Sequence, residues 1–237
     1  MNTLLRFLGI QLVASAAARL PGPLARLVTA VVLVVVNLLP VWAVMTERIG
    51  MGDVFIVYWI ENVVVWACGI VRTATAEGPG KGTVAVTTNG RPGDMSSAKF
   101  FALHYGIFTL VHGVFAFVMA FLAGGDLHPG TWLLAGLTLA LSHVGSLWLN
   151  WYDGGERWRV SATTAMWQPY PRMLVLHVAI ILGLGLALRS VGSSDTPGRL
   201  EELAPVLLLL GLKTGVDLAL HLWERRRARS ATPVGTA

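Results

Sequence analysis

The chain of 237 residues contains little charge and a single cysteine. Charged residues make up 13% of the sequence, whereas soluble domains carry roughly 25%. The lone Cys68 rules out an intrachain disulfide and any metal site built from thiolates alone. These shortages exclude a disulfide-stabilised secreted domain and disfavour an ordinary soluble fold.

Long apolar runs are what the sequence has instead. Hydrophobic residues account for 54% of the chain, and its mean hydropathy is +0.64. A helix of about 20 apolar residues crosses a hydrocarbon core of ~30 Å, and the runs of about that length are 24–45, 54–72, 98–122, 131–150, 173–188 and 203–224. The predicted fold is therefore all-α, a polytopic membrane helix bundle of six transmembrane helices within residues 24–226. Its predicted environment is the lipid bilayer of the plasma (cell) membrane.

The distribution of basic residues gives the predicted orientation. With both termini cytoplasmic, most of the 18 Lys and Arg residues fall on the cytoplasmic side of the bundle. Only Arg48, Arg189 and Arg199 fall on the other side, which is the positive-inside pattern. An even number of spans follows from this arrangement.

Both ends of the chain are predicted to lie at the membrane surface. Residues 1–23 are apolar but interrupted by Arg6, Gln11 and Arg19, which favours an interfacial amphipathic helix; a cleaved signal peptide is the alternative. Residues 227–237 form a basic tail that is predicted to be disordered. Because the arginine cluster at 225–229 directly follows the last apolar run, its predicted partners are anionic lipid headgroups and not nucleic acid.

The connection 73–97 is rich in Gly, Thr and Pro and is predicted to be a mobile surface loop. Its glycine-rich stretch at 78–83 lacks the spacing of a Walker motif, which argues against a nucleotide site. The sequence also lacks the Gly-x-Ser-x-Gly elbow of serine hydrolases and shows no internal repeat of the kind found in inverted-repeat transporters.

Ionisable residues inside the apolar runs are costly in lipid and are therefore candidate functional residues. At ~1.5 Å rise per residue, His104, His143 and His177 each lie roughly 10 Å from the cytoplasmic start of their runs. Asp217 and His221, four residues apart on one helical face, bracket the same depth. These five residues form the predicted metal-ligand layer.

A second polar layer is predicted farther from the cytoplasmic side. It comprises Glu61, Asn62, His112 and Lys213. His112 lies two helical turns beyond His104, which is too far for both side chains to bind one ion. Because an unpaired charge at this depth is expensive, Glu61 is expected to pair with either Lys213 or His112.

These residue types leave several functional hypotheses open. Imidazoles with a carboxylate suit zinc, iron or copper in a metal-binding protein, whose activity would be redox or hydrolytic if it is an enzyme. His104 and His177 are alternatively the axial ligands of a b-type haem. In another hypothesis, Glu61, Lys213, Asp217 and the histidines form the relay of a proton-coupled transporter or carrier. In the last, the same groups form a salt-bridge network that only fixes helix packing in a structural or partner-binding bundle.

The polar residues lie in distinct motifs. These are Tyr-Trp-Ile-Glu-Asn at 58–62, His-Tyr-Gly-Ile-Phe at 104–108 continuing to His-Gly at 112–113, Ser-His at 142–143, Pro-Tyr-Pro-Arg at 169–172, and Lys-Thr-Gly-Val-Asp from 213 through His221. In this combination the chain, from about residue 30 onward, resembles an uncharacterised prokaryotic family of integral membrane proteins, a domain of unknown function. The resemblance implies a six-helix membrane protein and adds Glu156 and Arg172 at the cytoplasmic edge, but it implies no activity.

Overall fold

The computed structural model describes residues 43–46, 49–122 and 127–192, together with isolated positions between 204 and 215. The N-terminal segment 1–23, almost all of the first predicted span, most of the sixth, and the tail 227–237 lie outside the described residues. Lys213, Asp217 and His221 lie outside them as well. The predicted location of both termini therefore stays a prediction.

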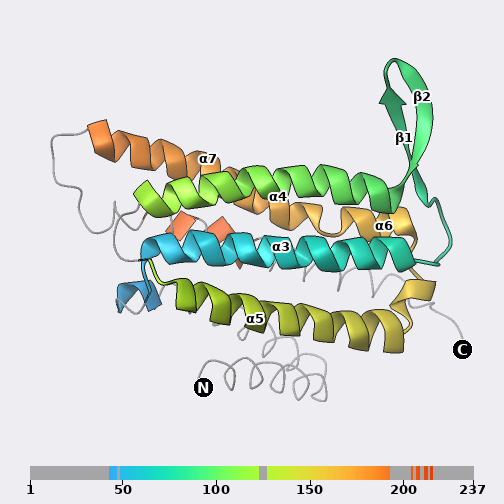
Figure 1. Cartoon of the computed structure of the whole chain (residues 1–237), viewed down its shortest axis with the longest axis horizontal. Helices are drawn as coiled ribbons and strands as arrows, with labels where there is room; N and C mark the ends of the chain where they lie inside the picture. Colours follow the sequence, from blue (N-terminus) through green and yellow to red (C-terminus); the bar gives the residue numbers. More distant parts are fainter. Residues whose placement is uncertain are drawn as a thin grey trace, which may run out of the picture.

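Long helices that run in two opposite directions make up the described bundle (Figure 1). They are α3 (Met51–Thr75) and α5 (Pro129–Ser146), which run one way, and α4 (Ser97–Leu122) and α7 (Tyr170–Gly192), which run the other; a π-helical segment (Leu147–Asp153) extends α5, and a 3-10 turn (Glu156–Trp158) and a short α6 (Ala162–Trp167) precede α7. The stretches Gly52–Thr75, Ser97–Leu122 and Pro129–Asp153 are long and apolar enough to cross a membrane. They confirm the second, third and fourth predicted spans as helices, and α7 contains the predicted fifth.

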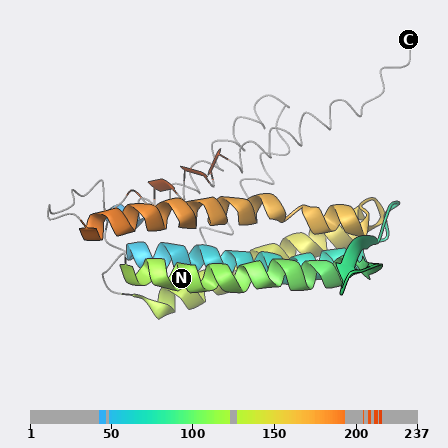
Figure 2. The same cartoon turned by 90° about the horizontal axis from the view of Figure 1, so that it is seen from above.

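Helix α3 lies at the centre of the bundle. Figure 1 shows α4 and α5 on opposite sides of α3, and Figure 2 shows α7 in a layer beside the α3–α4 pair. The short α6 packs against α3 and α4 at the end of the bundle where α3 ends and α4 begins. Helices α4 and α7 run in the same direction, so residues that follow each other along α4 face residues in the same order along α7.

One face of α5 carries an exposed apolar stripe. Leu133, Leu137, Leu141 and Val144 are all exposed at spacings of three and four residues, so they lie on one side of the helix. In water such a stripe would be an aggregation liability, whereas lipid chains solvate it. The stripe supports the bilayer as the environment of the bundle.

Indole rings fill glycine gaps between α3 and α4. Trp59 lies against Gly113, where an added Cβ atom would come within 2.7 Å of the indole nitrogen. The same arrangement recurs one heptad away between Trp66 and Gly106, where the corresponding distance to the ring is 2.8 Å. The Trp59 indole also donates a hydrogen bond of 2.9 Å to the Thr109 carbonyl oxygen. The two glycines therefore permit close contact between the helices.

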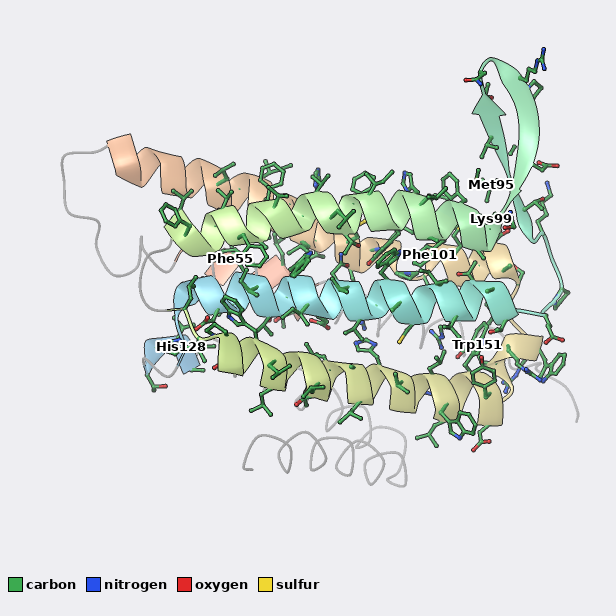
Figure 3. The ribbon with its side chains drawn as sticks, in the orientation of Figure 1. Phe55, Met95, Lys99, Phe101, His128 and Trp151 are labelled. Carbon is green, nitrogen blue, oxygen red and sulfur yellow. The ribbon has the colours of Figure 1, made fainter. Side chains whose placement is uncertain are left out.

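Two apolar clusters fill the interior, one toward each end of the bundle. Phe55 belongs to the cluster around the start of α3, and Phe101 to the cluster around the start of α4, as Figure 3 shows. The first cluster also contains Val44, Val54, Ile56, Ala116, Met119, Ala120, Leu176, Ala179 and Ile180, and the second contains Val65, Tyr105, Met166 and Met173. The buried polar residues Asn62, Thr109 and His112 lie between the two clusters. The interior is therefore an apolar bundle with a polar layer near its middle.

The prediction of a mobile loop at 73–97 is wrong for the second half of that segment, which forms a β-hairpin in an otherwise mostly helical structure. Strand β1 (Thr83–Thr88) pairs antiparallel with β2 (Arg91–Ser96), and the hairpin projects sideways from the bundle at the end where α4 begins (Figure 1). Asn89 and Gly90 have φ values of 52° and 75°, and a two-residue type I′ turn requires positive φ at both positions. An Asn-Gly pair next to a Thr- and Val-rich run is a hairpin signal, which the overall Gly and Pro content of the segment obscured.

The first half of the same segment is bonded to the connection between α5 and α6. The Glu77 N–H donates to the Arg157 carbonyl oxygen at 2.8 Å, and the Gly78 N–H donates to the Val160 carbonyl oxygen at 3.1 Å. These backbone hydrogen bonds join the connection after α3 to the connection between α5 and α6, two segments that lie far apart in the sequence. They make the segment part of a folded cap at this end of the bundle.

We expect Gly78→Ala to lower the free energy of unfolding by about 1–3 kcal/mol, the usual cost of overpacking. An added Cβ atom would lie 2.4 Å from the Val160 backbone nitrogen, and backbone cannot rotate aside as a side chain can. Gly82→Ala is the matched control, because nothing lies within 4 Å of its Cβ position. Thermal unfolding in detergent should give a lower Tm for Gly78→Ala alone. Equal Tm values for the two variants would contradict this packing.

Candidate functional site

Two histidines meet near the middle of the bundle, where α4 packs against α7. His112 Nε2 and His177 Nδ1 are 3.1 Å apart, which is hydrogen-bond distance. The His112 side chain is buried, whereas His177 is exposed on α7. The other ring nitrogen of His112, Nδ1, contacts the carbonyl oxygen of Phe108 one turn earlier on α4. We call His112 and His177 the imidazole pair.

The Phe108 carbonyl fixes where the protons of the imidazole pair sit. A carbonyl oxygen can only accept a hydrogen bond, so His112 Nδ1 must carry a hydrogen. In the neutral pair, His112 Nε2 is then an acceptor and His177 Nδ1–H donates to it. This leaves His177 Nε2 as the unprotonated nitrogen, on the exposed member of the pair. The pair can therefore accept one proton at that nitrogen without losing either hydrogen bond.

Phe108 partly offsets the cost of placing positive charge on the imidazole pair. The Phe108 ring centroid lies 6.0 Å from the His112 centroid and 6.4 Å from the His177 centroid. The negative face of an aromatic ring attracts a nearby cation, and so does the oxygen end of a carbonyl dipole. Phe108 supplies both groups, one from its side chain and one from its backbone. These two contacts offset part of the cost of burying a cation shared by the two rings.

A second histidine contact lies nearer the hairpin end. His104 Nδ1 and the Tyr170 hydroxyl are 2.9 Å apart, and the His104 ring packs between Phe100 and Phe108 with centroid distances of 5.0 and 5.1 Å. The rings around His104 belong to the apolar cluster at this end of the bundle or border it. A histidine with one hydrogen bond, surrounded by aromatic rings, is typical of a residue that contributes to packing.

Asn62 connects α3 to α4 through a closed set of hydrogen bonds. The Tyr105 hydroxyl donates to Asn62 Oδ1 at 2.6 Å, and Asn62 Nδ2 donates to Thr109 Oγ1 at 3.2 Å. The Thr109 hydroxyl in turn donates to the Tyr105 carbonyl oxygen at 2.9 Å. Because these polar groups are buried and partnered, the network fixes the register of the two helices. Glu61 and Arg172 act electrostatically on the same Tyr105 hydroxyl.

The structure groups the histidines differently from the predicted layer. His177 lies beside His112, and His104 lies beside Tyr170, the first residue of α7. Helix α6 packs beside the first turns of α4, so α7 begins at the level of His104 and not at the level where α4 begins. A residue seven positions into α7 then reaches His112, eight positions beyond His104. The depth estimate assumed that all apolar runs start at one level of the bundle. Helix α7 instead starts at a different level from α4.

The remaining predicted metal ligands do not complete a site within the described residues. His143 lies on α5, which packs mainly against α3 on the side away from α4, and Asp217 and His221 lie outside the described residues. In the part of the chain that the structure describes, no group of three or more His, Cys, Asp or Glu side chains is arranged to hold a metal ion. A b-type haem does not fit either, because its proposed axial ligands His104 and His177 bond to different partners about two helical turns apart.

The residues predicted at the cytoplasmic edge lie at the hairpin end of the bundle. Glu156 accepts a 2.6 Å bond from Arg72, whose guanidinium also lies 5.0 Å from the centroid of the Trp151 ring. Figure 3 shows Trp151 at this end. The Trp151 indole donates to the Thr75 hydroxyl at 2.8 Å, which ties the π-helical segment to the end of α3. Arg172 is exposed at the start of α7.

Sequence reasoning missed Asp53, a fully buried carboxylate at the opposite end of the bundle. Its Oδ1 accepts from the His128 backbone N–H at 2.9 Å and the Trp132 indole at 2.7 Å, and its Oδ2 accepts from the Gly50 N–H at 2.9 Å and His128 Nδ1 at 2.8 Å. Figure 3 shows His128 at this end, beside the start of α3. We call Asp53, His128 and Trp132 the carboxylate clamp, since it joins α3 to the start of α5. The available signal was the acidic residue in the first turn of a predicted helix.

Three helices long and apolar enough to cross a membrane, together with the exposed apolar stripe on α5, indicate a helical membrane protein. The chain belongs to a family of unknown function, DUF6498, which matches residues 19–234. This confirms the predicted resemblance to a family that is a domain of unknown function. No curated protein and no solved structure matches the chain.

Proposed function

We propose that the protein is a proton-coupled membrane carrier whose proton-binding site is the imidazole pair. The observation that carries the proposal is the chain of contacts from the Phe108 carbonyl through His112 to His177. It leaves one basic nitrogen, His177 Nε2, on the exposed side of the pair. Titratable groups within a membrane span are rare and costly, and proton-coupled transport is one of the functions that retains them.

The geometry favours a carrier over a proton wire. A proton taken up at His177 Nε2 displaces the shared proton toward His112 Nε2, but the far nitrogen of His112 already donates to the Phe108 carbonyl. That carbonyl is a poor base and cannot pass the proton on. The proton must therefore leave by the nitrogen at which it entered. Net transfer then requires the site to be exposed to each side of the membrane in turn, as in a carrier with alternating access.

The first test of the proposal is the protonation state of the imidazole pair. Nitrogen-15 NMR of histidine-labelled protein in detergent should show His112 as the Nδ1–H tautomer at neutral and alkaline pH. On acidification, the nitrogen signals of His112 and His177 should change together, since the two rings share one hydrogen bond. In His177→Asn, this joint change should disappear. A His112 ring in the Nε2–H tautomer would contradict the assignment.

The second test measures charge movement without a known substrate. A pH jump applied to protein on a solid-supported membrane should give a transient current as the pair binds protons. His112→Asn and His177→Asn should abolish the current, because each removes one ring of the pair. His104→Asn is the matched control, since His104 lies on the same helix but contacts Tyr170 instead. Near-stoichiometric zinc, iron or copper in the wild-type protein that is lost in His177→Asn would overturn the proposal and favour a metal site.

A further inference from the structure

A row of aromatic and basic side chains extends along the π-helical segment that follows α5 and along the 3-10 turn. The Trp148 and Tyr152 ring centroids are 5.9 Å apart, and the Arg157 guanidinium lies 5.6 Å from the Tyr152 centroid and 4.2 Å from the Trp158 centroid. Trp148 and Trp158 are 62% and 52% exposed. We call these four residues the aromatic-arginine row. It does not contact the imidazole pair, and its role is independent of proton binding.

The aromatic-arginine row lies at the end of a helix that is long enough to span a membrane. The stretch Pro129–Asp153 includes Trp148 and Tyr152 and ends directly before the 3-10 turn. Exposed Trp and Tyr side chains at the ends of membrane spans lie at the level of the lipid headgroups. The row therefore runs from the edge of the hydrocarbon core into the headgroup region.

The charge at this end of the bundle suits an anionic headgroup. The basic residues of the described chain, apart from Arg189, all lie at this end: Arg72, Lys81, Arg91, Lys99, Arg157, Arg159 and Arg172. Glu77, Asp94, Asp153 and Glu156 only partly balance them. A cationic surface beside the membrane attracts anionic lipids.

Arg157 is the residue in the row with unfilled hydrogen-bonding capacity. Its guanidinium carbon lies over the Trp158 ring, a cation–π contact that uses none of its N–H donors. The nearest carboxylate oxygen, Glu77 Oε1, is 3.9 Å from Arg157 Nη1, longer than an N–H···O hydrogen bond. Two parallel N–H groups of a guanidinium match two oxygens of a phosphate. The stacked rings hold the guanidinium in place, so little side-chain freedom is lost when a phosphate binds.

We propose that the aromatic-arginine row is a binding site for the phosphate of an anionic phospholipid, with Arg157 as the phosphate ligand. Trp148 and Tyr152 contact the upper part of the acyl chains and the glycerol, and Trp158 supports the guanidinium. Glu77 competes with the lipid phosphate for the same guanidinium. The neighbouring Arg159 donates to the Gly154 carbonyl oxygen and so holds the turn that presents Arg157.

The test is thermal unfolding of the purified full chain in detergent with added phosphatidylglycerol, phosphatidylcholine or inorganic phosphate. We expect phosphatidylglycerol to raise the Tm and the other two additives to leave it unchanged. Arg157→Gln should lose this rise. Arg91→Gln is the control and should keep it, because Arg91 is exposed at the turn of the projecting hairpin.

A gain-of-function variant keeps the proposal testable if Arg157→Gln does not fold. Glu77→Gln removes the competing carboxylate, so the rise in Tm with phosphatidylglycerol should become larger than in the wild type. An unchanged rise in Arg157→Gln, or a smaller rise in Glu77→Gln, would overturn the proposal. An equal rise with phosphatidylcholine or with inorganic phosphate alone would overturn it too, because the site would then not select an anionic lipid.

Discussion

Replacing Asp53 by alanine should lower the free energy of unfolding by about 3–5 kcal/mol, because several hydrogen-bond donors lose their acceptor at a cost of about 1–3 kcal/mol each. The carboxylate is fully buried and accepts all the hydrogen bonds of the clamp, two at each oxygen. Without it, the His128 and Trp132 donors and the Gly50 N–H lose their acceptor. Buried donors without a partner cost more than the bond itself contributes.

The clamp has a large effect because it fixes two elements at once. The Asp53 backbone N–H donates to the Gly50 carbonyl oxygen, and the Gly50 N–H donates back to the carboxylate, which closes the first turn of α3. The two oxygens also hold His128 and Trp132, which lie 75 and 79 residues later in the chain. The negative charge lies at the positive end of the α3 dipole, which adds to its stability.

Thermal unfolding in detergent measures the effect of the clamp. For a chain of this length, a loss of a few kcal/mol lowers the Tm by on the order of 10 °C. Asp53→Asn should lie between the wild type and Asp53→Ala, because its one amide oxygen still accepts from two donors. Asp94→Ala is the control, since Asp94 is exposed on the hairpin. A Tm for Asp53→Ala equal to that of Asp94→Ala would refute the clamp.

The helices could be predicted from the sequence because each is a long apolar run. The stretches of α3, α4 and α5 were found to within a few residues, since about 20 apolar residues have few alternatives to a membrane helix. The hairpin was missed although Asn89 and Gly90 were visible, because composition alone was used for that segment. The short α6 was not predicted, and its presence shifts α7 along the bundle axis by about its own length.

The candidate site could be predicted only in part, because the unpredicted α6 also changes which residues of α4 and α7 meet. Intramembrane His112 and His177 were both identified as candidates, because polar residues in an apolar run are conspicuous. Their pairing depends on where along the bundle axis α7 begins. No sequence pattern within an apolar run indicates that position. The partner of Asp53, His128, lies in a connection between two helices far along the chain. A contact between two such distant positions leaves no local signal in the sequence.

The glycines between α3 and α4 support the last prediction, that Gly106→Ala combined with Gly113→Ala is strongly destabilising. An added Cβ atom would meet the Trp66 ring at 2.8 Å and the Trp59 indole nitrogen at 2.7 Å. Each indole must then move and weaken its N–H bond to a carbonyl oxygen of α4. Overpacking costs about 1–3 kcal/mol per site. The better helix propensity of alanine returns roughly 1 kcal/mol at each site.

The two sites lie seven residues apart, about 10 Å along the helix, so their effects should nearly add. The double variant should therefore lose up to about 4 kcal/mol, the overpacking cost at two sites less the propensity gain. Gly145→Ala is the matched control: nothing lies within 4 Å of its Cβ position, and it should be neutral or slightly stabilising. Trp59→Leu should recover part of the loss in Gly113→Ala, because the smaller side chain leaves room for the added methyl group. Additive destabilisation by Trp59→Leu and Gly113→Ala would instead mean that the ring and the glycine are not in contact.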